Sequence, residues 1–233
     1  MRRYELGFSL CLMMLGVASC ARPPGEERLS IAAIAPKPNA ETLPKDVFER
    51  SSQAIVGITY PTGLVRYPRL ASMLAHHAAT RRAALQTALA ANPTPSVPYE
   101  LTLRFTTVAD SPRLFAVRAE EDLYIGGMAS TPRSSTFIWL PGADRLLKPN
   151  ELLADASSWA QVDRYIHDRM LEEGAALPSQ AESGSRDRDF FPRMDSDGQI
   201  AGLVFSLPEG NVEVPAAVLR TLIASGYSDL LSH

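Results

Sequence analysis

The sequence predicts an α+β fold, a mostly antiparallel sheet with helices packed on one face. Runs with apolar residues at every second position come in groups, and apolar stripes with helical spacing separate these groups. The expected order is one strand, a helix, four or more strands, a helix, three strands and a final helix. Runs of strands with helices between the runs are typical of α+β proteins.

The first half of the chain contains the clearest elements. Residues 54–60 are rich in Ile, Val and Thr and predict a strand. Pro68 fits the first position of a helix, whose leucine stripe extends to about residue 91. Strict alternation at residues 101–106 predicts a half-buried strand. Two further strands are expected at residues 114–125 and 137–140. The first follows a turn at Asp-Ser-Pro, residues 110–112, and the second leads into a turn at 141–144.

The second half begins with an amphipathic helix at residues 157–173, where Trp159, Val162, Ile166 and Met170 form a stripe. A polar loop is expected at 178–188. Strands at 190–194 and 200–207 flank the turn Asp-Ser-Asp-Gly at 195–198. A short strand at 212–214 and a helix that opens at Pro215 close the domain, with Val218, Leu219, Leu222 and Ile223 facing the core.

Residues 20–47 precede the folded region and contain five prolines, without periodicity. Such a segment forms no regular element and acts as a flexible tether. We therefore expect a signal segment at 1–19, a tether at 20–47 and one domain at 48–233.

The export segment ends at Cys20. Arg2 and Arg3 precede an apolar stretch at 6–17 that is too short to span a bilayer. Val-Ala-Ser-Cys at 17–20 has the pattern of a bacterial lipobox, the alternative being an ordinary signal peptide that ends near a cysteine. We expect lipidation of Cys20, and the non-Asp residue Ala21 indicates the periplasmic side of the outer membrane.

Charge and cysteine usage exclude several function classes. The chain has a formal net charge of −3, and loss of a segment with charge +1 leaves −4 on the mature protein. This weak acidity disfavours a nucleic-acid partner. The two cysteines are Cys11 and Cys20, so the mature domain would have no thiol for a disulfide, a nucleophile or a zinc site. We expect no cofactor, no metal and no catalytic motif.

Several segments carry a resemblance to a known family. Ile-Thr-Tyr-Pro at 58–61 precedes the leucine-rich helix, and Ser-Pro-Arg-Leu-Phe-Ala-Val at 111–117 precedes Tyr-Ile-Gly-Gly at 124–127. Phe-Ile-Trp-Leu at 137–140 and Val-Glu-Val-Pro at 212–215 follow in the expected order. Over most of residues 54–225, the chain resembles the extracellular region of RsiV-type anti-sigma factors. The resemblance implies an envelope domain, which in the best-understood relatives binds lysozyme.

The chain departs from that family at three places. Met128-Ala129 follows the double glycine where the family has Ala-His, and residues 150–153 replace Asp-Leu-Phe. The loop of the closing hairpin, residues 206–210, is shorter than usual. Because no sigma-binding segment or transmembrane helix precedes the domain in this sequence, we do not expect sigma-factor regulation.

The candidate partner-binding residues lie in two loops. Gly126 and Gly127 allow a positive φ or a close backbone approach. They indicate either a structural turn or a partner-contacting loop at 126–135, in which Arg133 and Ser134 would be contacts. Arg186 and Arg188 lie in the polar loop. A basic loop residue would suit the two carboxylates of a muramidase cleft.

Three other patterns have plain structural interpretations. Asp195-x-Asp197-Gly198 lacks the later ligands of a calcium loop and favours a turn. His76 and His77 point about 100° apart on a helix, so they are poorly placed to share a metal. Residues 120–122, Glu-Glu-Asp, indicate either a solvated strand end or an acidic patch for a basic partner.

The sequence therefore favours a lipid-anchored periplasmic binding protein that recognises a lysozyme-like peptidoglycan hydrolase, as an inhibitor or an immunity protein. Two alternatives stay open: an envelope structural lipoprotein that contacts peptidoglycan or another envelope protein, and an enzyme acting on wall material.

Overall fold

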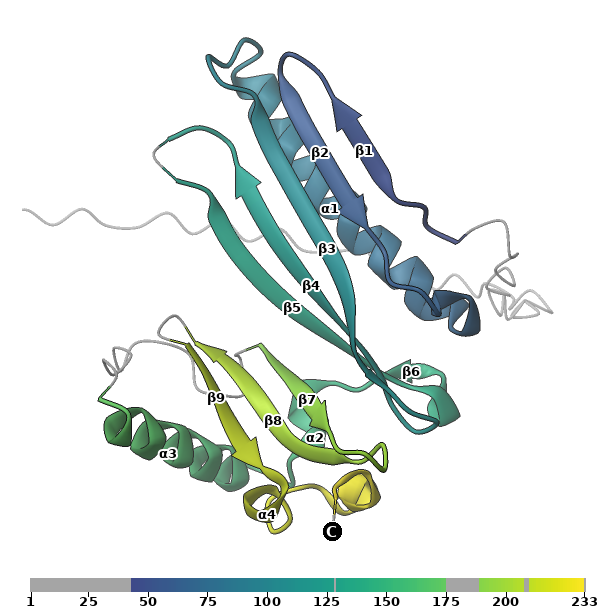
Figure 1. Cartoon of the computed structure of the whole chain (residues 1–233), viewed down its shortest axis with the longest axis vertical. Helices are drawn as coiled ribbons and strands as arrows, with labels where there is room; N and C mark the ends of the chain where they lie inside the picture. The colour runs from purple at the N-terminus through teal and green to yellow at the C-terminus, as the bar shows by residue number, and fades with distance from the viewer. Residues whose placement is uncertain (1–42, 128, 175–188, 208–209, 233) are drawn as a thin grey trace, which may run out of the picture. The chain divides into compact units, whose positions relative to one another are not determined.

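The computed structural model describes residues 43–127, 129–174, 189–207 and 210–232. It confirms an α+β fold in which most strand pairs are antiparallel (Figure 1). The strands are β1 (Val47–Arg50), β2 (Ala54–Thr59), β3 (Tyr99–Asp110), β4 (Phe115–Tyr124), β5 (Thr131–Leu140), β6 (Arg145–Leu146), β7 (Phe190–Met194), β8 (Ile200–Leu207) and β9 (Gly210–Pro215). The α-helices are α1 (Pro68–Ala91), α2 (Pro149–Leu152), α3 (Ala156–Glu172) and α4 (Ala216–Leu219).

The first sheet contains six strands in the order β1-β2-β3-β4-β5-β6. Strands β2 and β3 are parallel and α1 connects them, whereas the other neighbours are antiparallel. A parallel pair needs such a crossover, because a tight turn can join only antiparallel strands. Strands β3, β4 and β5 form a meander in the middle of the chain.

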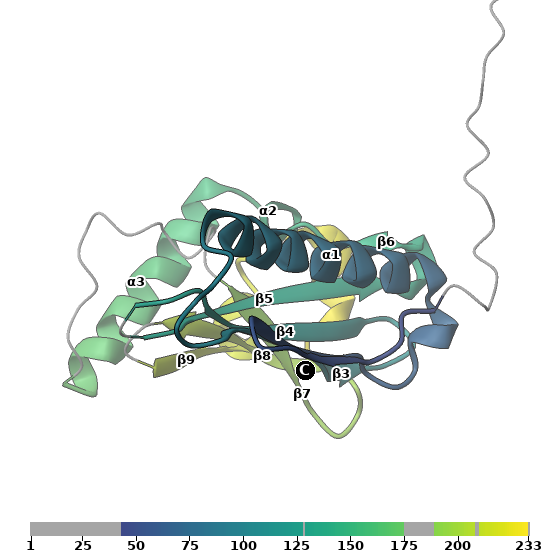
Figure 2. The same ribbon diagram turned by 90° about the horizontal axis from the view of Figure 1, so that it is seen from above.

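Helix α1 covers one face of this sheet, as Figure 2 shows. Its sequence contains no glycine, and Pro68 occupies the first turn, where a missing N–H costs nothing. Leu70, Leu74 and Leu85 are fully buried against Leu101, Leu103 and Phe115 of the strands. The predicted bounds of this helix are confirmed.

The second sheet contains β7, β8 and β9, and α3 packs against it. Asp155 caps α3, since its side chain accepts a hydrogen bond from the N–H of Ser158 at 2.8 Å. The predicted stripe of Trp159, Val162, Ile166 and Met170 is buried in a core cluster with Phe190 and Phe205 of the sheet.

The two sheets meet where β7 approaches β3, β4 and β5. Arg118 of β4 joins them: its guanidinium lies 4.6 Å from the ring centre of Phe191, and its Nη2 donates to Ser206 Oγ at 3.0 Å. The meander is therefore buried on both sides, against α1 on one face and against the second sheet on part of the other.

The structure corrects the sequence-based expectations in four respects. The strands form two sheets rather than one, and α1 and α3 each pack on a different sheet. Strand β1 was not predicted as a strand, and its first residue was expected to belong to the tether, yet it pairs with β2 along residues 55–58. Strand β5 begins six residues earlier than predicted, and the last α-helix is only four residues long.

No helix in the described ranges is long and apolar enough to cross a membrane.

Candidate functional site

The connection between β4 and β5 is a narrow tip shaped by two glycines. Gly126 and Gly127 have φ values of 97° and 105°, a region that side chains other than hydrogen disfavour. The Tyr124 hydroxyl donates to the carbonyl of Gly127 at 3.4 Å, and the neighbouring Ile125 is 46% exposed. The strand ends that meet here lie away from the three-stranded sheet (Figure 1).

The predicted loop at 126–135 is wrong in its second half, because Arg133 and Ser134 belong to β5. Arg133 pairs with Glu121 and Ser134 with Glu120 of β4. Since side chains alternate along a strand, Arg133 points to the face covered by α1 and Ser134 to the opposite face. The structure therefore separates two residues that were expected to act together. Cys20, Arg186 and Arg188 lie outside the described residues.

The acidic run at 120–122 is divided in the same way. Glu121 is buried under α1, where Arg81 Nη2 donates to its Oε1 at 2.5 Å. Glu120 and Asp122 are exposed on the open face, opposite to α1. Glu100 of β3 is exposed on that same face and lies diagonal to Asp122, two register positions along, since Asp122 pairs with Thr102 and Glu100 with Tyr124. Three carboxylates therefore lie along this face of the sheet, next to the glycine tip, and the exposed Arg104 of β3 lies opposite Glu120. We name Glu100, Glu120 and Asp122 the acidic ladder.

Of the two adjacent histidines, His77 is half-buried in the interface between α1 and the sheet. Its ring packs edge-on against Phe105 and Phe137, at centroid distances of 6.0 and 5.3 Å. Burial lowers the pKa of His77, and this outweighs the opposing effect of Glu121. Arg81 and His76 lower the pKa further. No group of three metal-ligating side chains is found in the described part of the chain.

This environment predicts a pH-dependent stability. The unfolded chain binds a proton at His77 near pH 6.5, whereas the folded chain resists it, so folding stability is lost as the pH falls below about 6.5. We expect the His77→Gln variant to show a smaller loss of unfolding free energy between pH 7.5 and pH 5 than the unsubstituted protein. Urea unfolding at a series of pH values measures this, and parallel curves for the two proteins would contradict it.

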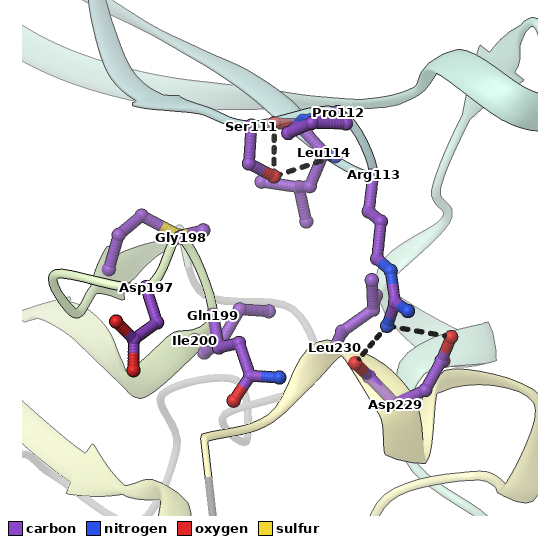
Figure 3. Close-up of a pocket in the computed structure, with 11 residues that line it drawn as sticks. Ser111, Pro112, Arg113, Leu114, Asp197, Gly198, Gln199, Ile200, Asp229 and Leu230 are labelled. Carbon is purple, nitrogen blue, oxygen red and sulfur yellow. Dashed lines mark hydrogen bonds and ion pairs between the residues drawn. The ribbon is translucent and has the colours of Figure 1, made fainter.

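A pocket of about 250 Å³ lies where the β3–β4 turn, the β7–β8 turn and the C-terminal 3-10 helix (Ser225–Leu230) meet (Figure 3). Ser111 shapes the first turn by accepting a hydrogen bond from the N–H of Leu114 at 3.1 Å. Arg113 Nη1 donates to Asp229 Oδ2 at 3.0 Å across the rim. The side chains of Asp197 and Gln199 complete a polar lining.

Sequence reasoning did not identify this pocket, although it predicted two of its turns. The turn at 195–198 is confirmed: Asp195 Oδ1 accepts hydrogen bonds from the N–H groups of Asp197 and Gln199, both at 2.9 Å. Asp-Ser-Pro at 110–112 marks the other turn. What the sequence could not show is that residues more than 80 positions apart converge there.

No protein-family model matches the chain, and no curated protein is significantly similar to it. Solved structures that share its fold include two DUF3298 family proteins. A DUF3298 family protein from Pseudomonas aeruginosa PAO1 has 11% identity and a TM-score of 0.59, over 82% of this chain and 97% of its own. A DUF3298 member from Bacteroides fragilis NCTC 9343 has 12% identity and a TM-score of 0.52, over 78% of this chain and 92% of its own. At these identities the likeness shows the fold alone.

Proposed function

We propose that this protein is an RsiV-like, lipid-anchored binding protein on the periplasmic side of the outer membrane, which recognises a lysozyme-like peptidoglycan hydrolase without itself being an enzyme. The lipobox at Cys20 and the RsiV-like segments of the sequence support this role. The fold shared with bacterial DUF3298 proteins is compatible with it.

The observation that carries the proposal is the acidic ladder beside the glycine tip. Glu100, Glu120 and Asp122 are exposed on one face of the sheet, and the chain turns at Gly126 and Gly127 directly after β4. Many lysozymes are cationic, so the negative charge of the ladder would accelerate their association with this face and orient the bound lysozyme. The glycine tip would then lie across the mouth of the hydrolase's substrate cleft, and the two carboxylates that line the cleft would keep the ladder itself outside it.

Removing the ladder's charge tests this proposal. We expect the Glu100→Gln/Glu120→Gln/Asp122→Asn variant to associate with a cationic lysozyme at least tenfold more slowly at low ionic strength, because the steering field is lost. The mature chain, residues 20–233 with Cys20→Ser, is measured by surface-based kinetics against a panel of lysozymes and wall hydrolases.

The control removes two charges elsewhere, at Glu172 and Glu173 of the α3 end, where both carboxylates pair with Arg169. Glu172→Gln/Glu173→Gln should leave the association rate nearly unchanged. The absence of binding across the whole panel would refute the proposal. Affinity for purified peptidoglycan in that case would indicate the structural lipoprotein.

A further inference from the structure

The outer edge of β5 has no strand beside it along residues 131–137, in the part of the chain that the structure describes. Strand β6 covers this edge only at Trp139 and Leu140, where it runs antiparallel to β5. The chain then leaves the edge at Leu147, whose N–H donates to the carbonyl of Ile138 at 2.8 Å. An edge of this length presents a row of unpaired backbone groups, which proteins normally cover or protect.

The direction of each backbone group on this edge follows from the hydrogen bond between the N–H of Leu147 and the carbonyl of Ile138. Because the carbonyl of Ile138 points away from β4, those of the even-numbered residues Thr136, Ser134 and Pro132 do so too. Pro132 fits this position because it has no N–H to offer. Among the described residues, the backbone groups on this edge that have no partner are therefore the N–H and C=O of Ser134 and Thr136 and the C=O of Pro132.

An apolar groove of about 410 Å³ lies beside this edge, on the face that α1 covers. Met73, which is 40% exposed, His76 and His77 line it from the helix, and Phe137 lines it from β5. The side chains of Ser135 and Arg133 follow Phe137 on the same face of β5, at every second position. A strand added to the edge would therefore point alternate side chains into the groove.

The charge beside the groove and the β5 edge is predominantly positive. Neither α1 nor β5 contains Asp or Glu. The nearby carboxylates of Glu121 and Asp144 are already paired with Arg81 and Arg69. Arg133 is exposed, and it makes no ion pair with any described residue. It lies about 14 Å from Phe137 along the strand, at about 3.4 Å per residue.

We propose that the edge of β5 and this groove form a docking site for an extended polypeptide segment of a partner protein, added antiparallel to β5 in line with β6. Its residues opposite Phe137 and Ser135 are apolar and enter the groove, and a carboxylate lies opposite Arg133. Backbone bonds to Ser134 and Thr136 supply the affinity and the groove selects the side chains, as in recognition by strand addition. This site is independent of the acidic ladder, which lies on the other face of the sheet.

The probe is the peptide acetyl-Leu-Thr-Val-Thr-Glu-Thr-amide, in which Leu would face Phe137 and Glu would face Arg133. Two N-methylated versions separate strand addition from simple apolar contact. Methylation at the fourth residue, opposite Ser134, blocks a bond to the edge. An N-methyl group at the third residue points away from the β5 edge and blocks no bond to it. We expect the first change to abolish binding to the mature chain and the second to preserve it.

Protein variants test the same site from the other side. Ser134→Pro removes an outward N–H and no bond to β4, and Met73→Glu places a charge in the groove. Each should weaken binding at least tenfold. Phe48→Ser, which alters the 80% exposed aromatic side chain of β1 at the opposite edge, should not. In NMR spectra, the amides of Ser134 and Thr136 should gain protection from exchange when the peptide is added.

Equal binding of both methylated peptides, unchanged binding by the two variants, or no binding at all would overturn the proposal. Dimerisation of the protein that Ser134→Pro abolishes would also overturn it, because the occupant would then be a second copy of the chain. Since the probe is a peptide, these outcomes are separate from those of the hydrolase panel.

Discussion

Glu121→Ala is expected to lower the free energy of unfolding by about 3 kcal/mol, because it leaves the charge of Arg81 buried without its partner. The side chain of Glu121 is 5% exposed and that of Arg81 is 19% exposed. The Nε of Arg81 has no partner in the described residues, so the Arg81–Glu121 pair is its main compensation. In a thermal scan the loss corresponds to a decrease of about 6–12 °C in Tm.

Two controls give this result its meaning. Arg69→Ala removes an exposed pair between the same helix and the turn before β6, with side chains 65% and 60% exposed, and should cost less than about 1 kcal/mol. The double variant Arg81→Leu/Glu121→Leu removes both charges and should recover most of the stability. If Glu121→Ala lowers the free energy of unfolding no more than Arg69→Ala does, Glu121 is not what compensates the buried charge of Arg81.

Gly202→Ala is the second variant with a large expected effect, a loss of about 2 kcal/mol. A Cβ at Gly202 would lie 2.6 Å from Glu213 Oε1 and 3.0 Å from the backbone oxygen of Val214. Because Arg193 holds that carboxylate by two hydrogen bonds, the new methyl group must break the Arg193–Glu213 pair or shift β9.

Gly57→Ala is the matched control, since Gly57 also lies within a strand and a Cβ there meets no atom within 4 Å. It should be neutral or stabilise the protein by about 0.5 kcal/mol, because alanine restricts the unfolded chain. Denaturation in guanidinium chloride compares the two variants. If Gly202→Ala lowered the free energy of unfolding no more than Gly57→Ala does, the second sheet would accommodate the added methyl group without cost.

The elements that the sequence predicted well have strong local patterns. The helix at 68–91 and the strands at 190–194 and 200–207 have the bounds expected from their apolar spacing. Strand β1 was missed because Val-Phe-Glu-Arg shows no clear alternation and its Phe48 is exposed. The first half of β5 was missed because Arg133, Ser134 and Ser135 lie where the sheet is only partly covered, so the strand carries no apolar signal there.

The candidate sites depend on pairing between distant segments, which local patterns do not encode. Arg81 and Glu121 are 40 residues apart, and no spacing rule connects a helix residue to a strand residue at that distance. The acidic ladder can be recognised only from the register between β3 and β4, which places Glu100 opposite Tyr124. The free edge of β5 became apparent only when β6 proved to be two residues long.

The meander of β3, β4 and β5 has a consequence for the order in which the chain can fold. Its contacts join neighbouring segments, so its loops close at a small entropic cost. The core under α1 and the core of the second sheet both use its residues, such as Val117 for the first and Ala116 for the second. Neither core can form without it, so we expect residues 99–140 to contain the folding nucleus. Substitutions there should slow folding, and substitutions in α3 should mainly accelerate unfolding.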